Sequence, residues 1–259
     1  MNQDKARELI RQLAVEAGFT VTLVEQPPAP AVPLAAVPGF TKAEDAFTDY
    51  GAFYDFLRGN ALLGPTISKS EFEGCDAIIT ACVKESYPIS YTAYALATSY
   101  LETAHTMQPI KELGGTAYYT RMYDIKGQRP AKAKELGNLA MGDGAKYPGR
   151  GYVQLTGKKN YAKATAKLRE MGLDVDLVAN PDLAMRPDVA ALVMAIGMKE
   201  GWFTTRKLSD DLPPAGVATV PQFVASRDII NGTDRQADVA NYAFQFQTGL
   251  VQGGYRLAA

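Results

Sequence analysis

The most informative stretch of this 259-residue sequence is Gly149-Arg-Gly-Tyr-Val-Gln-Leu-Thr-Gly-Lys-Lys-Asn-Tyr161. Tyr152, Gln154 and Thr156 alternate with two aliphatic residues, and this period of two predicts a short, half-buried strand. Glycines on either side are typical of tight turns or of close approach by a ligand. One face of the strand would carry an aromatic ring, an amide and a hydroxyl group. These groups suit a sugar, although a polar hairpin in any small domain would also explain them.

The N-terminal part of the chain differs from the rest in residue composition and pattern. Residues 3–17 predict a short amphipathic helix. Five prolines between Glu25 and Pro38 are typical of an extended linker. We therefore expect an N-terminal helical appendage (1–24), a proline-rich linker (25–40) and a main domain (41–259). The appendage is too short to bury its own core, so it could dock on the main domain, self-associate or bind a partner.

Composition is that of an ordinary soluble globular protein, with 47% hydrophobic and 21% charged residues. The net charge of −1 gives no argument for a nucleic-acid partner. Charge is uneven, however, with twelve Lys/Arg and three Asp/Glu between Arg121 and Arg169. This basic stretch is either a solvated face or a flank that attracts an acidic polymer. No apolar run long enough to span a membrane is present, and residues 1–10 are too polar for a signal peptide.

The two cysteines, Cys75 and Cys82, lie seven residues apart in a predicted helix. This spacing separates them by about 10 Å along the helix axis, whereas a disulfide needs Cα atoms within about 7 Å. We expect buried, reduced thiols. A single histidine and the absence of a Cys-x-x-Cys pair also predict no metal site, and we expect no cofactor.

Most of the main domain has a helical pattern. Ser68 is a predicted cap for a helix that continues to about residue 85, and a second helix begins at Ser90. Residues 189–200 are apolar all round, which predicts a central, buried helix. Tyr118, Tyr119 and Tyr123 are expected on a loop, as local packing or as a platform for sugar. Further helices are predicted over 130–136, 159–171, 220–230 and 237–249.

Two carboxylates follow the second of these helices, at Glu102 and Glu112. Glu102 comes after an apolar helix face, so partial burial would favour its neutral form. A general acid needs that form near neutral pH. The alternative is an ordinary glutamate at a helix end.

The wording of residues 149–161 closely resembles the signature of family 19 glycoside hydrolases, which include plant-type chitinases and many phage endolysins. Three further landmarks occur in the order of that family: Leu101-Glu-Thr, Gly201-Trp-Phe and Ile230-Asn-Gly. Leu101 replaces the histidine of the family tripeptide, which puts the surroundings of Glu102 in question. These sequence motifs resemble those of the phage and bacterial enzymes of the family more than those of the plant enzymes.

The resemblance implies a mainly α, lysozyme-like, two-lobed helical domain with a small β-hairpin region. It implies that Glu102 donates a proton and that Glu112 activates a water held by Thr156, with Asp124 as the reserve for the second acid. Inversion at the sugar requires carboxyl groups roughly 6.5–9.5 Å apart. Substrate contacts are expected from Gln154, Asn160, Tyr161, Asn231, Tyr119 and Arg150.

The function implied is that of a peptidoglycan-degrading endolysin, an N-acetylmuramidase that acts on glycan strands. We expect a monomer without membrane insertion, made in the host cytoplasm and released to the cell wall or carried in a virion. A chitinase of the same family is the nearest alternative. A lytic transglycosylase, which needs only Glu102, and a catalytically inactive wall-binding protein are the others.

Overall fold

The computed structural model describes residues 41–60 and 62–256. The appendage (1–24) and linker (25–40) predicted from the sequence lie outside the described residues. Within the described residues the chain forms two compact units. Unit 1 is the continuous segment Pro109–Ala190, and unit 2 combines residues 41–108 with residues 191–256.

The described part of the chain is mainly helical, and its strands form one two-stranded antiparallel sheet. The predicted fold class, mainly α with a small hairpin region, is therefore confirmed. The predicted division into two lobes corresponds to the two compact units.

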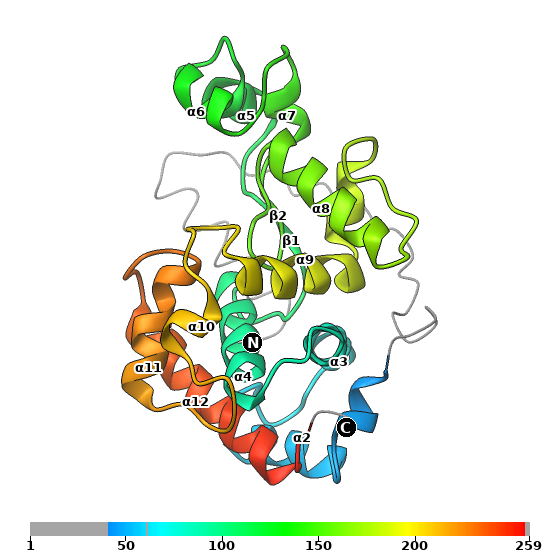
Figure 1. Cartoon of the computed structure of the whole chain (residues 1–259), viewed down its shortest axis with the longest axis vertical. Helices are drawn as coiled ribbons and strands as arrows, with labels where there is room; N and C mark the ends of the chain where they lie inside the picture. The colour runs from blue at the N-terminus through cyan, green and yellow to red at the C-terminus, as the bar shows by residue number, and fades with distance from the viewer. Residues whose placement is uncertain (1–40, 61, 257–259) are drawn as a thin grey trace. The chain divides into compact units, whose positions relative to one another are not determined.

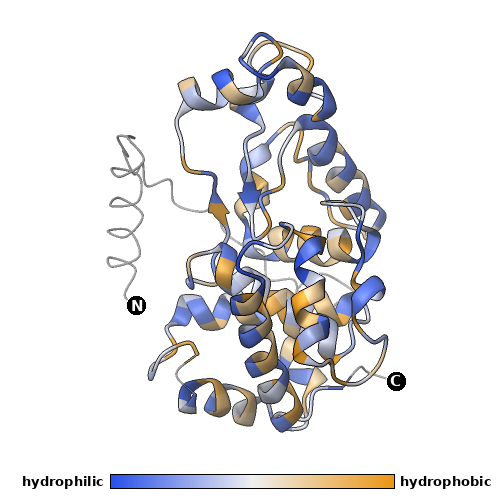
Figure 2. Cartoon of the chain, turned by 90° about the vertical axis from the view of Figure 1, so that its left-hand side faces the viewer, coloured by the Kyte–Doolittle hydropathy of each residue, from blue (hydrophilic) through white to orange (hydrophobic). Residues whose placement is uncertain are grey.

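Unit 2 is a helical bundle in which α4 packs against α3 and α12, while α12 also contacts α2 and α11 (Figure 1). Hydrophobic and hydrophilic residues are interspersed along the helices of the chain (Figure 2), as expected of helices with one buried face. The predicted cap of α3 is confirmed, because the Ser68 and Glu71 side chains each accept a backbone N–H of the other residue. The elements of this unit are η2 (Ala43–Ala46), α2 (Tyr50–Gly59), α3 (Lys69–Lys84), α4 (Ile89–Glu102), α10 (Leu208–Asp211), α11 (Val220–Ala225), η4 (Ser226–Ile229) and α12 (Gln236–Gln252).

Two helices are buried along almost their whole length. Every residue from Ser90 to Leu101 in α4 is buried. In α9 (Pro187–Glu200), which begins in unit 1 and ends in unit 2, residues 188–198 are buried. The prediction of a central, buried helix here is confirmed. Cys75 and Cys82 are both buried and free, as expected from their spacing.

Unit 1 carries the sheet, in which Ile110 pairs with Gly151 and Lys111 pairs with Arg150. Helix α5 packs against α6 and α7. The predicted helices over 130–136 and 159–171 are confirmed by α6 and α8. The elements are β1 (Ile110–Lys111), α5 (Thr116–Tyr123), α6 (Pro130–Glu135), α7 (Asp143–Lys146), β2 (Arg150–Gly151), α8 (Lys158–Glu170) and η3 (Pro181–Met185).

The loop expected around Tyr118, Tyr119 and Tyr123 is instead helix α5. A helix places residues four apart on one face, and here that spacing brings the Tyr119 and Tyr123 hydroxyl groups to the same residue, Glu112. A pattern of single residues could not reveal this contact, because Glu112 lies outside the helix.

The strand predicted across Tyr152, Gln154 and Thr156 is wrong. Strand β2 ends at Gly151, and the chain then turns back so that Leu155 pairs with Arg150. Gly151 and Gln154 have positive φ angles of 92° and 56°, a conformation that ends an extended strand. Tyr152 is consequently buried, whereas Gln154 and Thr156 are partly exposed.

Candidate active site

The first candidate carboxylate, Glu102, is the last residue of α4 in unit 2. Its side chain is 22% exposed, and its Oε1 lies 2.8 Å from Nη2 of Arg227. The Arg227 side chain is only 1% exposed. A charge-assisted bond from a buried guanidinium fixes the position of a carboxyl group more strongly than a surface ion pair does. Glu102 is therefore an oriented side chain at the end of a buried helix.

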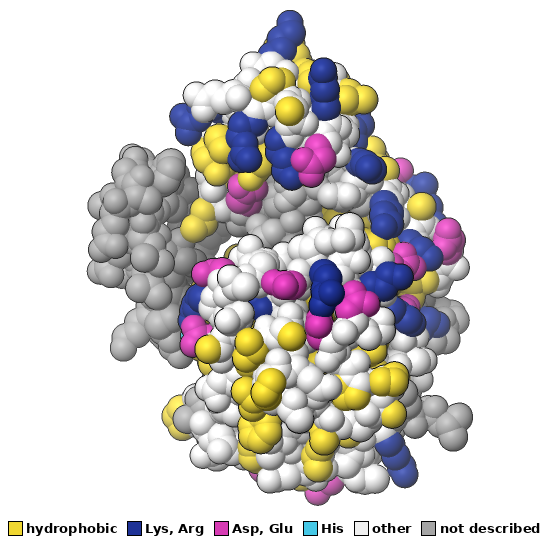
Figure 3. Space-filling model, turned by 60° about the vertical axis from the view of Figure 1, so that its left-hand side comes forward, with side chains coloured by type: hydrophobic (Ala, Val, Ile, Leu, Met, Phe, Trp, Pro, Cys, Tyr) yellow, Lys and Arg dark blue, Asp and Glu magenta, His cyan; other side chains and the backbone are white. Residues whose placement is uncertain are grey.

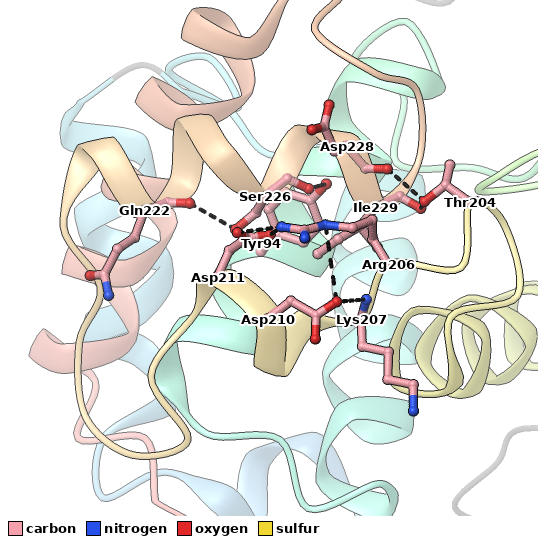
Figure 4. Close-up of polar contacts among 10 residues, drawn as sticks. All are labelled: Tyr94, Thr204, Arg206, Lys207, Asp210, Asp211, Gln222, Ser226, Asp228 and Ile229. Atoms are coloured by element: carbon pink, nitrogen blue, oxygen red, sulfur yellow. Dashed lines mark hydrogen bonds and ion pairs between the residues drawn. The ribbon is translucent and has the colours of Figure 1, made fainter.

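Arg227 lies in η4 and is held by the backbone around it. Its Nε donates to the carbonyl oxygen of Asp234 at 2.8 Å. The buried Tyr94 hydroxyl donates to the carbonyl oxygen of Ser226 at 2.7 Å, and Thr204 Oγ1 lies 2.6 Å from that of Asp228 (Figure 4). Both neighbours of Arg227 in the chain are thus bonded to other elements of unit 2. Within the described residues, Nη1 of Arg227 is buried without a hydrogen-bond partner.

The second candidate carboxylate, Glu112, directly follows β1 in unit 1. Tyr123 Oη donates to its Oε1 at 2.7 Å, and the Gly149 N–H donates to its Oε2 at 3.1 Å. The backbone N–H of Glu112 donates in turn to the carbonyl oxygen of Gly149 at 2.8 Å. Both carboxylate oxygens are therefore held, by neutral donors.

The Tyr123 hydroxyl remains a donor at any working pH. Burial raises the pKa of Tyr123, and the hydrogen bond to the Glu112 carboxylate raises it further. A protonated phenol can donate a hydrogen bond to a carboxylate. Tyr123 is therefore a constant donor to the half-buried Glu112 carboxyl group.

Gln154 and Thr156 lie beside Gly149. A Cβ atom on Gly149 would approach Gln154 Oε1 to 2.6 Å and Thr156 Oγ1 to 3.2 Å, so a larger residue here would displace the Gln154 side chain. The Thr156 hydroxyl donates to the carbonyl oxygen of Gln154 at 2.8 Å. Gln154 Nε2 donates to the carbonyl oxygen of Ile110 at 3.1 Å. Unit 1 thus brings together three predicted residues: Glu112, Gln154 and Thr156.

Asp124, the reserve for the second acid, has a structural role in unit 1. It is 2% exposed, and its Oδ2 accepts the backbone N–H of Gly142 at 2.6 Å. A carboxylate in this position stabilises the turn before α7. Its burial argues against contact with substrate or with an attacking water, and favours Glu112.

Arg150 and Tyr161 are also buried. Arg150 donates to Asp182, to the carbonyl oxygens of Lys146 and Pro148, and to Tyr161 Oη. The Tyr161 hydroxyl donates to the carbonyl oxygen of Pro148 at 2.8 Å. These bonds hold the turn that precedes the sheet, and they argue against direct contact of either side chain with a sugar.

The other expected substrate contacts differ in exposure. Asn231 is exposed on the turn after η4, and its N–H donates to the carbonyl oxygen of Arg227 at 3.1 Å. Asn160 is partly exposed, but its side-chain amide donates to the carbonyl oxygen of Thr156 at 2.7 Å. The Tyr119 ring is buried. Asn231 in unit 2 and Gln154 in unit 1 therefore remain the more accessible of the predicted contacts.

Two residues of the site were missed by the sequence analysis, Arg227 and the Tyr123 partner of Glu112. Arg227 lies one residue after Ser226 in a segment chosen for its Ile-Asn-Gly wording. Its neighbours Ser226 and Asp228 are polar, so the local sequence gives no signal that this arginine is buried.

The two units differ in charge. Unit 1 contains fourteen Lys/Arg and nine Asp/Glu, and the described part of unit 2 contains ten and fifteen, which gives +5 and −5. Among the described residues, no three His, Cys, Asp or Glu side chains are grouped to hold a metal ion. None of the described helices is both long and apolar enough to span a bilayer.

Comparison with known proteins gives a distant structural likeness. No family model matches the sequence, and no curated protein does. Chitinase C from Streptomyces griseus HUT6037 has 21% sequence identity and a TM-score of 0.40, over 83% of this chain and 77% of that one. A mutant of chitinase C has the same identity and TM-score, over 85% of this chain and 97% of that one. Values this low establish neither family nor substrate, so the function has to be argued from the residues of this chain.

Proposed function

We propose that this protein is a glycoside hydrolase that cleaves β-1,4 bonds next to N-acetylated amino sugars. The observation that carries the proposal is the pair of oriented, partly exposed carboxylates at the positions of the family 19 signature. Arg227 holds Glu102, and Tyr123 with Gly149 holds Glu112. Hydrolysis of a glycosidic bond by a pair of carboxyl groups is a common mechanism of such enzymes.

In the proposed reaction, Glu102 protonates the leaving oxygen and Glu112 deprotonates a water that Thr156 helps to hold. One oxygen of Glu102 is bound to Arg227, which leaves Oε2 for the proton. Two neutral donors, Tyr123 and the Gly149 N–H, fix the position of the Glu112 carboxyl group, which acts as the general base in this reaction. Attack by water on the face opposite the leaving group inverts the anomeric carbon.

Peptidoglycan is the proposed substrate, and lysis of a phage host is the proposed role. The resemblance of the sequence motifs to phage enzymes supports this substrate. The +5 charge of unit 1 supports it too, because peptidoglycan is acidic. We propose that the enzyme reaches the cell wall from the host cytoplasm or in a virion and acts as a monomer. Chitin remains the nearest alternative, since it shares the β-1,4-linked N-acetylglucosamine unit.

The test is mass spectrometry of the fragments released from purified Gram-negative peptidoglycan. We expect reducing N-acetylmuramic acid ends. Anhydro ends would establish a transglycosylase and remove Glu112 from the mechanism. Release from chitin oligosaccharides alone would establish a chitinase. Binding to the wall without release of fragments from either polymer would overturn the proposal in favour of a binding protein.

A further inference from the structure

Residues 137–142 in unit 1 expose two large hydrophobic side chains next to α5 and α7. Leu139 is 68% exposed and Met141 is 70% exposed, the highest values among the exposed large hydrophobic residues of the described chain. Single exposed hydrophobic residues are common on protein surfaces. Two such residues on one short segment are less common when hydrogen bonds hold the backbone so that neither side chain can become buried.

Hydrogen bonds fix this segment on both sides. The buried Asn138 donates to the carbonyl oxygen of Tyr123 at 3.0 Å and accepts the backbone N–H of Lys158 at 2.9 Å. The backbone N–H of Gly142 donates to the buried Asp124 at 2.6 Å. Between them, the N–H of Ala140 donates to Asp143 Oδ2 at 3.0 Å. The exposure of Leu139 and Met141 is therefore built into the fold of unit 1.

The surface around these two side chains is cationic. Of the three acidic residues between 113 and 147, Asp124 and Asp143 are buried, and Glu135 pairs with Lys132 at 2.8 Å. Basic and hydrophobic side chains gather over α5–α7, at the top of Figure 3. Together with Leu139 and Met141, we call this surface the cationic tip; its six basic residues are Arg121, Lys126, Arg129, Lys132, Lys134 and Lys146.

We propose that the cationic tip binds the surface of a membrane rich in anionic phospholipid. Its Lys and Arg side chains would contact lipid phosphates, and Leu139 and Met141 would enter the boundary between headgroups and acyl chains. The two hydrophobic residues favour this partner over an acidic glycan, which would engage the cations and leave both apolar side chains in water. The binding is peripheral and independent of the proposed hydrolysis.

The experiment is co-sedimentation of the full chain with lipid vesicles. We expect binding to vesicles of equimolar phosphatidylcholine and phosphatidylglycerol, and none to phosphatidylcholine alone. Because the attraction is largely electrostatic, binding should weaken by about tenfold when salt rises from low to above physiological concentration. Failure of the intact chain to bind the anionic vesicles would overturn the proposal.

Paired variants localise the binding. Leu139→Ser with Met141→Ser should weaken it by about tenfold, since each apolar side chain contributes through burial in the lipid. The matched control is Phe244→Ser with Val251→Ser, which removes two exposed hydrophobic residues from α12 in unit 2 and should change binding less than about twofold. All four side chains are exposed, so circular dichroism should show an unchanged fold. Equal losses in the two variants would overturn the proposal.

Charge reversal distinguishes insertion of the cationic tip into lipid from binding of its basic residues to any polyanion. Arg129→Glu with Lys134→Glu should also weaken vesicle binding by about tenfold, whereas the exposed pair Lys42→Glu with Lys69→Glu in unit 2 should not. Loss on charge reversal, together with full binding after removal of Leu139 and Met141, would contradict insertion into lipid. It would identify the tip as a general polyanion site instead.

Discussion

The two candidate carboxylates are held in different ways. In unit 2 the charged, buried Arg227 holds one oxygen of Glu102. In unit 1 the neutral donors Tyr123 and Gly149 hold both oxygens of Glu112. Two carboxyl groups can take different roles in one reaction only if their environments differ.

The largest expected effect is on hydrolysis when either carboxylate is removed. Glu102→Gln and Glu112→Gln should each lower kcat by about 10²–10⁴-fold, the usual contribution of a general acid or base. Glu135→Gln, a change to an exposed glutamate of unit 1, is the control and should leave kcat unchanged. The measurement is release of reducing ends from peptidoglycan.

Asp124 provides the counter-test of this assignment. Asp124→Asn should lower thermal stability, because the Gly142 N–H would lose a charged acceptor, while the folded fraction keeps its activity. If this variant is folded but inactive while Glu112→Gln retains activity, then Asp124 and not Glu112 is the second acid.

The next largest effect is expected from Arg227. Lysine cannot donate from two separate nitrogens to Glu102 and to the Asp234 carbonyl, as Arg227 does. Arg227→Lys should therefore lower kcat/KM by about 10–100-fold, on the scale of a charged hydrogen bond, and should also lower Tm. Arg235→Lys, a change to an exposed arginine of unit 2 that pairs with Asp238, is the control. Equal activity of the two variants would show that Arg227 does not orient Glu102.

A change at Tyr123 tests whether the neutral donors around Glu112 contribute to catalysis. Tyr123→Phe removes a donor to Glu112 and keeps the ring, so we expect kcat/KM to fall by about five- to tenfold. Steady-state hydrolysis of peptidoglycan is the measurement. An unchanged kcat/KM would show that the Tyr123 hydroxyl does not position Glu112.

The smallest effect concerns the pH dependence of stability in unit 2. Burial and the charge of Arg235 lower the pKa of His105 below its ordinary value of 6.5. Because the pKa of His105 is lower in the folded chain, the unfolded chain binds more protons as the pH falls. The stability that neutral His105 contributes is therefore fully present above pH 6.5 and is lost as the pH falls below it. His105→Asn, which tolerates the positive φ of 67°, should lose less Tm than the wild type between pH 7 and pH 5.5. An equal loss in both proteins would contradict this role.

Several helices of both units, although not α5, could be predicted because they depend on local signals. The Ser68 cap and the all-apolar stretch that became α9 are examples, since each is recognised from neighbouring residues. The prediction of a strand over Tyr152–Thr156 was wrong because the chain turns there through positive φ angles at Gly151 and Gln154. A positive φ angle at Gln154 is unusual for a residue with a side chain.

The resemblance to family 19 named Glu112, Gln154 and Thr156 as site residues, and this role stays a prediction. It did not name Arg227, which holds Glu102 and comes from a distant part of the chain. Arg227 is 125 residues from Glu102, and no local pattern connects them. The interior positions of Arg150 and Tyr161 could not be predicted either, because both types of side chain also occur in sugar-binding surfaces.

The anomeric form of the first product tests the two-carboxylate mechanism most directly. Proton NMR of a soluble β-1,4-linked N-acetylglucosamine or peptidoglycan oligosaccharide, recorded immediately after enzyme is added, distinguishes the possible outcomes. If Glu102 acts as acid and Glu112 as base, the α-anomer should appear first and the β-anomer should follow by mutarotation. Initial release of the β-anomer, or of a product with no reducing end, would contradict the mechanism.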